Sequence, residues 1–231
     1  MEPIISVRNL NKIYKTNTVR MNALNNVNLD ILPGEFCAIL GTSGSGKSTL
    51  LSLLAGLESP TSGKIFVLQK PLHRMSEGQL VEFRLRNTGF IFQSFNLMKA
   101  MTVLENAAFG LACQGVKRNE REKRARELLN NIGLGAHLNH KPMELSGGQQ
   151  QRAAIARAIL SQPKIIFADE PTGNLDSRTS EEIMDILKDA VRLNGSTLLM
   201  VTHDKEKARY ADRVIQIIDG RIVNDDLKTP V

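Results

Sequence analysis

A glycine-rich loop between an apolar strand and an apolar helix is the feature that most constrains the fold of this chain. The loop reads GTSGSGKS over residues 41–48, follows FCAIL and precedes TLLSLLAG. This order of strand, glycine loop and helix is the sequence context of a phosphate-binding loop. A purely structural glycine-rich turn is the alternative, which the flanking strand and helix disfavour. We therefore predict a phosphate site at the carboxyl end of a buried strand.

The residue types in this loop suit a nucleotide and its magnesium ion, so we expect ATP and Mg²⁺ as ligands. Glycines let backbone N–H groups turn toward the phosphates, Lys47 neutralises the β- and γ-phosphates, and the Ser48 hydroxyl can bind Mg²⁺. The residues expected to contact the nucleotide here are Gly41, Thr42, Ser43, Gly44, Ser45, Gly46, Lys47, Ser48 and Thr49. Upstream, Tyr14 is the plausible aromatic cover for the base, although composition alone does not select it.

Further apolar runs indicate an α/β fold. Strands are expected at 4–7, 36–40, 89–92, 165–168, 197–201 and 214–218. Several of these runs are almost continuously apolar, as strands buried on both faces of a parallel sheet are. Residues 94–160 read as helical throughout, which predicts a helical insertion, and the pair Asp219 and Gly220 predicts a two-residue hairpin turn. One folded domain over residues 1–231 is expected.

Polar residues at strand ends supply the candidates for hydrolysis. Asp169 ends an apolar strand and can reach Mg²⁺, while Glu170 can orient and deprotonate a water molecule. His203 follows another apolar strand, and groups beyond the carboxyl ends of parallel strands share one crevice. Gln93 closes a strand and can contact the metal or the water, but a loop glutamine without such a role is an open alternative.

A second anion-ready stretch lies about a hundred residues after the first. LSGGQQQR, residues 145–152, places two glycines just before a helical run, as at a helix start whose N–H groups are left bare for an anion. This stretch contains no lysine. The helix dipole contributes at most about 2 kcal/mol to anion binding, whereas micromolar nucleotide binding needs roughly 8 kcal/mol. We infer that it cannot hold ATP alone.

Composition narrows the class of protein further. The chain has 231 residues, 42% of them hydrophobic, which suffices for a core, and no apolar run approaches the roughly 20 residues of a membrane span. The start of the sequence lacks a basic signal-peptide region, and Cys37 and Cys113 suggest no disulfide framework, so a reducing cytosol is expected. The net charge of +6 could indicate nucleic acid, but the densest basic run, KRNEREKRAR, alternates in sign as a solvated helix does.

Taken in order, GTSGSGKS, Gln93, LSGGQ, IIFADE, GNLD and His203 resemble the nucleotide-binding subunit of ATP-binding cassette (ABC) transporters over nearly the whole chain. FRLRNTGFIFQSFNLMKAMTVLENA and ADEPTGNLDSRTS look like the group of macrolide-efflux and lipoprotein-release ATPases. The resemblance implies a P-loop NTPase (RecA-like) parallel-sheet core, an antiparallel β subdomain and an inserted α-helical subdomain.

The same resemblance implies roles for single residues. Tyr14 would stack on adenine, Gln93 would sense the γ-phosphate and the membrane partner, and His203 would hold the γ-phosphate. The signature residues would cap ATP bound to a second copy of the chain in a head-to-tail dimer. These are Ser146, Gly147, Gly148 and Gln149.

A transport ATPase docked on a separate transmembrane permease is the leading hypothesis, which places the chain peripherally on the inner face of the cell membrane. The alternative is a mechanotransmitting ATPase that regulates an envelope enzyme or peptide sensing without moving a substrate. Cassettes that act on nucleic acid carry coiled-coil insertions, cysteine-rich modules or two cassettes per chain, and none is visible here, so no nucleic-acid partner is expected.

Residues 94–101, SFNLMKAM, are the predicted docking surface for the permease, with a helical-subdomain core as the alternative.

Overall fold

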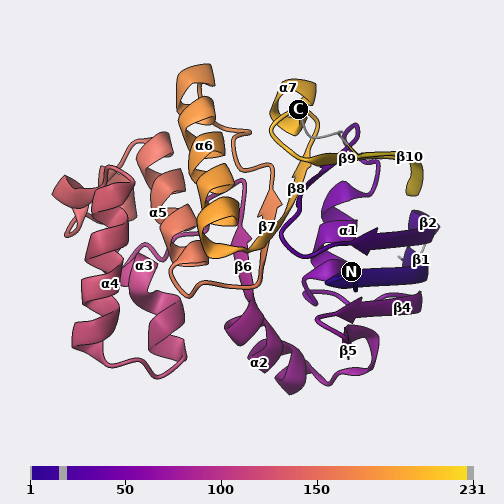
Figure 1. Ribbon diagram of the computed structural model, residues 1–231, viewed down its shortest axis with the longest axis horizontal. Coiled ribbons are helices and arrows are strands. Elements are labelled where there is room, and N and C mark those ends of the chain that lie inside the picture. Colours follow the sequence, from indigo (N-terminus) through magenta and orange to yellow (C-terminus); the bar gives the residue numbers. More distant parts are fainter. Residues whose placement is uncertain (1, 16–19, 228–231) are drawn as a thin grey trace. The chain divides into compact units, whose positions relative to one another are not determined.

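The computed structural model describes residues 2–15 and 20–227, which form two compact units (Figure 1). The first unit is built from the described residues up to 84 and from 197 onward, and the second contains residues 85–196. Parallel strands and helices alternate along the chain, as the predicted α/β class requires. Helix α2 (Glu77–Asn87) lies at the sequence boundary of the two units.

An antiparallel sheet forms one part of the first unit (Figure 1). Its order is β2 (Arg20–Ile31), β1 (Ile5–Lys15), β4 (Ser62–Val67) and β5 (Lys70–Pro71). The run expected at 4–7 is the start of β1, whereas β2 and β4 were not predicted. Their burial is mixed along each strand, because one face of an antiparallel sheet commonly meets solvent.

The phosphate loop follows a strand of the second group of paired strands in this unit. Strands β3 (Phe36–Leu40) and β8 (Thr197–Thr202) pair in parallel, and β9 (Arg213–Ile218) pairs in parallel with the other side of β3. β8 is buried along its whole length, and helix α1 (Lys47–Leu54) packs against it. The shorter elements of this unit are η1 (Leu72–Arg74) and α7 (Lys205–Ala208).

The predicted hairpin is confirmed at the end of the chain. Strand β10 (Arg221–Leu227) pairs antiparallel with β9, and the two residues between them, Asp219 and Gly220, have φ of 47° and 73°. Positive φ at both loop residues is the signature of the tight turn that matches strand twist.

The second unit combines a parallel strand pair with a group of helices. Strands β6 (Thr88–Ile91) and β7 (Ile165–Asp169) pair in parallel. The helices are α3 (Val103–Cys113), α4 (Arg118–Asn131), α5 (Gly147–Ile159) and α6 (Ser177–Asn194), with short turns η2 (Gly135–His137) and η3 (Pro142–Glu144). Between 94 and 160 the described structure contains helices and turns but no strand, as expected; the domain boundaries themselves stay a prediction.

Three of these helices share an apolar core that fixes the segment following β6. α3, α4 and α5 contribute most of its buried side chains, among them Leu104, Leu129 and Ala153. α3 starts with a capping box: the Thr102 hydroxyl accepts from the Glu105 backbone N–H, and the Glu105 carboxylate accepts from the Thr102 N–H. Leu97 packs against the same core from outside the helices.

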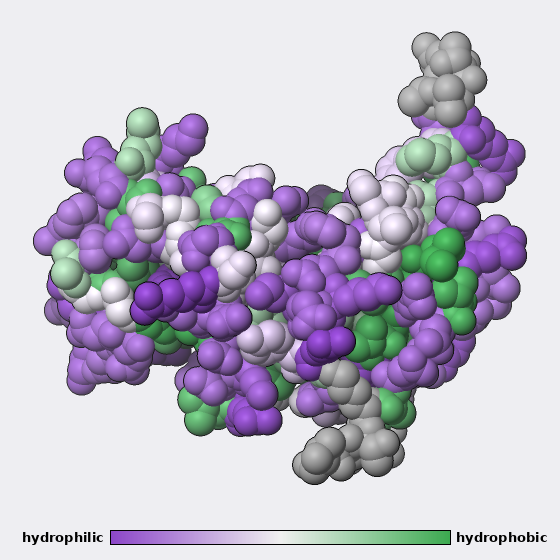
Figure 2. All heavy atoms as spheres, turned by 90° about the horizontal axis from the view of Figure 1, so that it is seen from above, coloured by the Kyte–Doolittle hydropathy of each residue, from purple (hydrophilic) through white to green (hydrophobic). Residues whose placement is uncertain are grey.

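The surface is mixed rather than apolar. On the face shown in Figure 2, apolar residues form separate patches among hydrophilic ones. Among the described residues, no helix has both the length and the apolar character needed to cross a membrane. Cys37 is buried and Cys113 is exposed, and both are free thiols.

Candidate nucleotide-binding and hydrolysis site

The phosphate loop joins β3 to α1, where the sequence placed it. Gly46, the residue before the helix, has a φ of 101°, and a Cβ on it would lie 2.5 Å from the carbonyl oxygen of Ala23. Only glycine fits this backbone conformation so close to β2. No side chain caps the start of α1, so its first N–H groups face the loop as anion donors do.

Two buried polar groups of the loop show that it is built for an anion. Lys47 is only 5% exposed, and its ammonium donates to the Thr42 carbonyl at 2.8 Å. Among the described residues it has no carboxylate partner, although a buried cation is costly without a counter-charge. The Ser45 hydroxyl is buried as well and has no hydrogen-bond partner among those residues. Phosphate oxygens would supply the counter-charge that Lys47 lacks and the hydrogen-bond partner that Ser45 lacks.

The β9–β10 hairpin supports this loop directly. The Gly220 N–H donates to the Ser45 carbonyl at 2.9 Å, and the Gly220 carbonyl accepts from the Asn25 N–H at 2.8 Å. The turn residue Gly220 therefore links the phosphate loop to β2. Sequence analysis predicted the turn but gave no signal that it contacts the loop.

Tyr14 lies on β1 beside the end of the loop. Its hydroxyl donates to Glu58 at 2.8 Å, and the Lys12 ammonium sits 4.9 Å from its ring centroid. Burial and the Glu58 bond raise the pKa of the phenol, while a hydrogen bond with Thr49 lowers it. Contact with Thr49 places the ring next to the phosphate loop, and the ring face opposite Lys12 is the one on which a base can stack.

His203 also lies next to the loop. Leu40 and Thr202 are register partners in the parallel pair β3–β8, and the Gly41 N–H donates to the Thr202 carbonyl at 3.3 Å. His203 follows directly and is exposed. In the first unit, Tyr14 and His203 thus both lie beside the phosphate loop.

The second unit brings Gln93, Asp169 and Glu170 together. Ile91 of β6 is the register partner of Ala168 of β7, so the residues after both strands emerge side by side. A Cβ on Gly173 would lie 3.0 Å from Gln93 Nε2 and 3.3 Å from Glu170 Oε2, which shows that both side chains converge there. Asp169 is the last residue of β7.

Glu170 has a φ of 44°, a rare conformation for a residue with a side chain. Strained backbone of this kind persists where the surroundings determine it, and it gathers at functional sites. The Gly173 N–H donates to the Glu170 carbonyl at 3.0 Å, and the Asn174 amide donates to the Gln93 carbonyl at 3.1 Å. The loop that contains GNLD therefore holds the backbone of both Glu170 and Gln93 in place.

The signature stretch begins α5, but its helix start is not bare, which corrects the sequence interpretation. Ser146 is the N-cap: its hydroxyl accepts from the Gln149 N–H at 3.3 Å, and Gln149 Oε1 accepts from the Ser146 N–H at 2.9 Å. The N–H groups of Gly147 and Gly148 keep no partner among the described residues. Two donors, rather than a whole helix end, thus face outward for an anion.

Sequence reasoning missed the residues that shape the segment between Gln93 and α3. Arg157 of α5 donates to the carbonyls of Phe95 and Asn96, whose φ values are 61° and 49°. Burial lowers the pKa of Arg157. Asn106 of α3 is fully buried and makes four hydrogen bonds to residues 98–102. A buried asparagine carries no recognisable signal in a single sequence.

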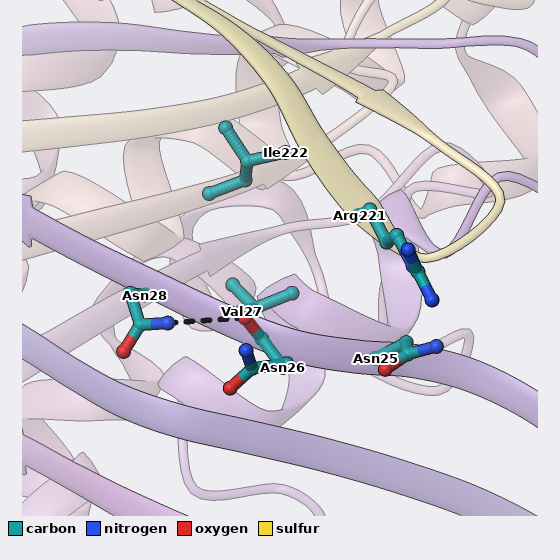
Figure 3. Close-up of a pocket in the computed structure, with 6 residues that line it drawn as sticks. All are labelled: Asn25, Asn26, Val27, Asn28, Arg221 and Ile222. Atoms are coloured by element: carbon teal, nitrogen blue, oxygen red, sulfur yellow. Dashed lines mark hydrogen bonds between the residues drawn. The ribbon is translucent and has the colours of Figure 1, made fainter.

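A shallow cavity of about 380 Å³ lies elsewhere in the first unit, between β2 and β10 (Figure 3). Its lining residues are Asn25, Asn26, Val27, Asn28, Arg221 and Ile222. None of the residues predicted from the sequence lines it, and amide side chains prevail in the view (Figure 3).

Comparison with known proteins decides the family. A family profile described as ABC transporter matches residues 24–173. This chain belongs to the ABC transporter family. An uncharacterised ABC transporter ATP-binding protein of Methanocaldococcus jannaschii, MJ1508, is 48% identical over 95% of this chain and 98% of that protein.

Two further ABC transporter proteins match the group suggested by the sequence. The lipoprotein-releasing system ATP-binding protein LolD of Geobacter metallireducens is 44% identical over 97% of this chain and 100% of that protein. The macrolide export ATP-binding/permease protein MacB of Mannheimia succiniciproducens is 43% identical over 99% of this chain but only 35% of that protein.

The ABC transporter cassette MJ0796, in a dimeric post-hydrolysis state bound to ADP and Pi, superposes with a TM-score of 0.92 at 41% identity. The match covers 98% of this chain and 100% of that one. The predicted P-loop fold and ABC-type ATPase activity are confirmed by these comparisons, with ATP as the nucleotide of the family. The roles of single residues stay predictions.

Proposed function

We propose that this ABC ATPase binds ATP and Mg²⁺ between two copies of itself and couples hydrolysis to a separate membrane permease. The observation that carries the nucleotide site is the buried Lys47 ammonium, which within the described ranges lacks a carboxylate partner and belongs to a loop whose Ser45 hydroxyl has no hydrogen-bond partner there. Lys47 and the loop N–H groups hold the phosphates, and Tyr14 stacks on the base. The metal ligands would be Ser48, Gln93 and Asp169. A bound Mg²⁺ there would offset phosphate charge and orient the γ-phosphate.

Hydrolysis rests on Glu170, held at its strained position beside Gln93. Its carboxylate takes the proton of a water molecule that Gln93 helps to orient, and His203 donates to the γ-phosphate as negative charge moves. This division of labour is supported by the convergence of the two side chains at Gly173.

The signature stretch serves the nucleotide of a second copy. Its capping box occupies two N–H groups and leaves those of Gly147 and Gly148 outward, too few donors to hold a nucleotide without a lysine. As a cap on phosphates already held by another loop, two aligned N–H groups suffice. The dimeric state of the MJ0796 cassette supports this arrangement.

Gly147 is the position at which this shared site is best tested. A Cβ on Gly148 would lie 2.5 Å from the Thr179 methyl group, so any substitution there disturbs α6, whereas a Cβ on Gly147 meets only ordinary contacts at 3.6 and 3.9 Å. Gly147→Asp adds a charge that repels phosphate in a desolvated interface, and Gly147→Asn is its uncharged match.

In a Glu170→Gln background, we expect Gly147→Asp to abolish ATP-dependent dimers in size-exclusion chromatography and Gly147→Asn to weaken them less. Both monomers should bind ATP within about twofold of the parent, because under this proposal the signature stretch contacts only the nucleotide of the other copy. A steep fall in monomer ATP affinity for Gly147→Asp would instead assign the stretch to its own nucleotide and reject the shared site.

The permease would dock on residues 94–101, at the cytoplasmic face of the membrane. Leu97 packs against the helical core, so the core alternative holds in part. Phe95 is only partly buried and is presented by a strained turn that Arg157 secures.

The match to LolD and MacB favours transport over the mechanotransmitting alternative. Identifying the membrane protein that co-purifies with the chain distinguishes the two.

A further inference from the structure

Gln149 of the signature stretch has a fixed amide orientation. Its Oε1 accepts the Ser146 N–H at 2.9 Å within the capping box, which turns its Nε2 group away from the helix start. That Nε2 lies 3.2 Å from Nε2 of His137, a residue of the η2 turn. The contact thus joins the signature to a histidine that neither the phosphate loop nor the hydrolysis groups require.

The chemistry of the two atoms fixes the state of the imidazole. An amide NH₂ can only donate, so Nε2 of His137 must offer its lone pair, and the ring proton must be on Nδ1. Nδ1 is buried and has no hydrogen-bond partner among the described residues. A proton on Nε2 would oppose the NH₂ group of Gln149 and break the contact. Only the neutral imidazole with its proton on Nδ1 fits.

The turn that carries His137 is itself well anchored. The His137 N–H donates to the Leu134 carbonyl at 2.9 Å, and its own carbonyl accepts from the His140 N–H at 3.0 Å. The following backbone binds the start of α3, through the Leu138 carbonyl to Leu104 N–H at 3.0 Å. The ring of one other titratable side chain, His140, lies against the His137 ring in the described structure, with the ring centroids 5.1 Å apart.

We propose that His137 is a positioning residue for the shared nucleotide site: its neutral ring holds the Gln149 amide, which in turn holds Ser146 and aims the Gly147 and Gly148 N–H groups at the partner's γ-phosphate. This inference rests on the proposed function of the signature stretch. Since the cap depends on one Gln149 amide serving both Ser146 and His137, losing the histidine acceptor loosens the donors without touching the nucleotide.

The test measures ATP-dependent dimerisation by analytical ultracentrifugation in the Glu170→Gln background. His137→Leu removes the acceptor, whereas the carbonyl oxygen of His137→Gln can replace Nε2 of the ring. His140→Leu is the matched control, since its ring touches His137 but makes no recorded contact with Gln149. Circular dichroism and the urea midpoint establish that each variant is folded.

We expect His137→Leu to weaken the dimer about tenfold, because each hydrogen bond is worth a few-fold and the dimer contains two. ATP binding to its monomer should be unchanged, and His137→Gln should restore dimerisation to within about twofold.

Three results would overturn the inference and leave the shared site standing. The first is normal dimerisation of His137→Leu, and the second is a folded His137→Gln that is no better than His137→Leu. The third is a loss in His140→Leu as large as that in His137→Leu, which would make the effect one of general packing. Failure of the Glu170→Gln parent to dimerise with ATP would refute the shared site itself, and the role of His137 with it.

Discussion

Replacing Asn106 with leucine should destabilise the second unit by about 3 kcal/mol, because one buried amide organises the whole segment before α3. Its Nδ2 donates to the carbonyls of Met98, Met101 and Thr102 at 3.0–3.1 Å, and its Oδ1 accepts from the Met98 N–H at 2.8 Å. Leucine has a similar volume, so the hydrogen bonds are the main loss.

The size of this loss in stability depends on which backbone groups keep another hydrogen-bond partner once the Asn106 amide is removed. After the substitution, the Met98 carbonyl still accepts from the Met101 N–H, and the Thr102 carbonyl still accepts from the N–H of residue 106. The Met98 N–H and the Met101 carbonyl are left without one. Each unsatisfied buried group costs about 1–3 kcal/mol, and both residues are only half-buried, so a total near 3 kcal/mol is expected.

The assay is urea unfolding followed by far-ultraviolet circular dichroism, since the chain contains no tryptophan. Hydrogen exchange of the α3 amides provides a second measurement in case the two units unfold separately. Asn119→Leu, on the exposed face of α4, is the control and should change stability by less than about 0.5 kcal/mol. A loss below about 1 kcal/mol for Asn106→Leu, with unchanged exchange in α3, would refute the argument.

Four other outcomes can be measured. Glu170→Gln should keep ATP affinity but lower steady-state phosphate release at least about a hundredfold, and turnover near that of the parent would remove Glu170 from the role of base. Lys47→Ala should weaken ATP binding itself, which nucleotide fluorescence tests directly. Phe95→Glu should uncouple permease-dependent ATPase activity while the isolated chain stays folded; altered circular dichroism would favour a core role. Hydrogen bonds from Thr102 lower the pKa of Glu105, so its contribution to stability is present at neutral pH and is lost as the pH falls through that lowered pKa, a dependence that Glu105→Gln should remove.

The sequence predicted the parts of the fold in which local pattern and burial agree. Strands β3, β7 and β8 are almost continuously apolar because they are buried on both faces, and the loop between β3 and α1 carries its own glycine pattern. β2 escaped prediction because its twelve residues, RMNALNNVNLDI, mix asparagine with apolar residues and pair irregularly with β1.

The candidate site residues could be selected from the sequence for the same reason, whereas the residues that support them could not. Lys47 belongs to a recognisable glycine-loop motif, and Glu170 and His203 each directly follow a recognisable strand. The contacts of Asn106 and His137 depend instead on which turns meet in space. In the sequence, His137 is distinguished only by its spacing of three residues from His140. Its actual neighbour, Gln149, is twelve residues away, and nothing in the spacing indicates it.

The hydrogen bond from the Gly220 N–H to the Ser45 carbonyl couples the position of the β9–β10 hairpin to that of the phosphate loop. If nucleotide binding shifts the Ser45 carbonyl, the turn must follow or lose its bond, and the same holds in reverse. Suppose that a molecule binds the β9–β10 hairpin and changes the affinity of the chain for ATP by some factor. Linkage then requires that bound ATP change the affinity of the hairpin for that molecule by the same factor. Arg221 follows Gly220 in the sequence, the Asn25 N–H donates to the Gly220 carbonyl, and both residues line the cavity between β2 and β10. The surface of this cavity is therefore connected to the phosphate loop through Gly220.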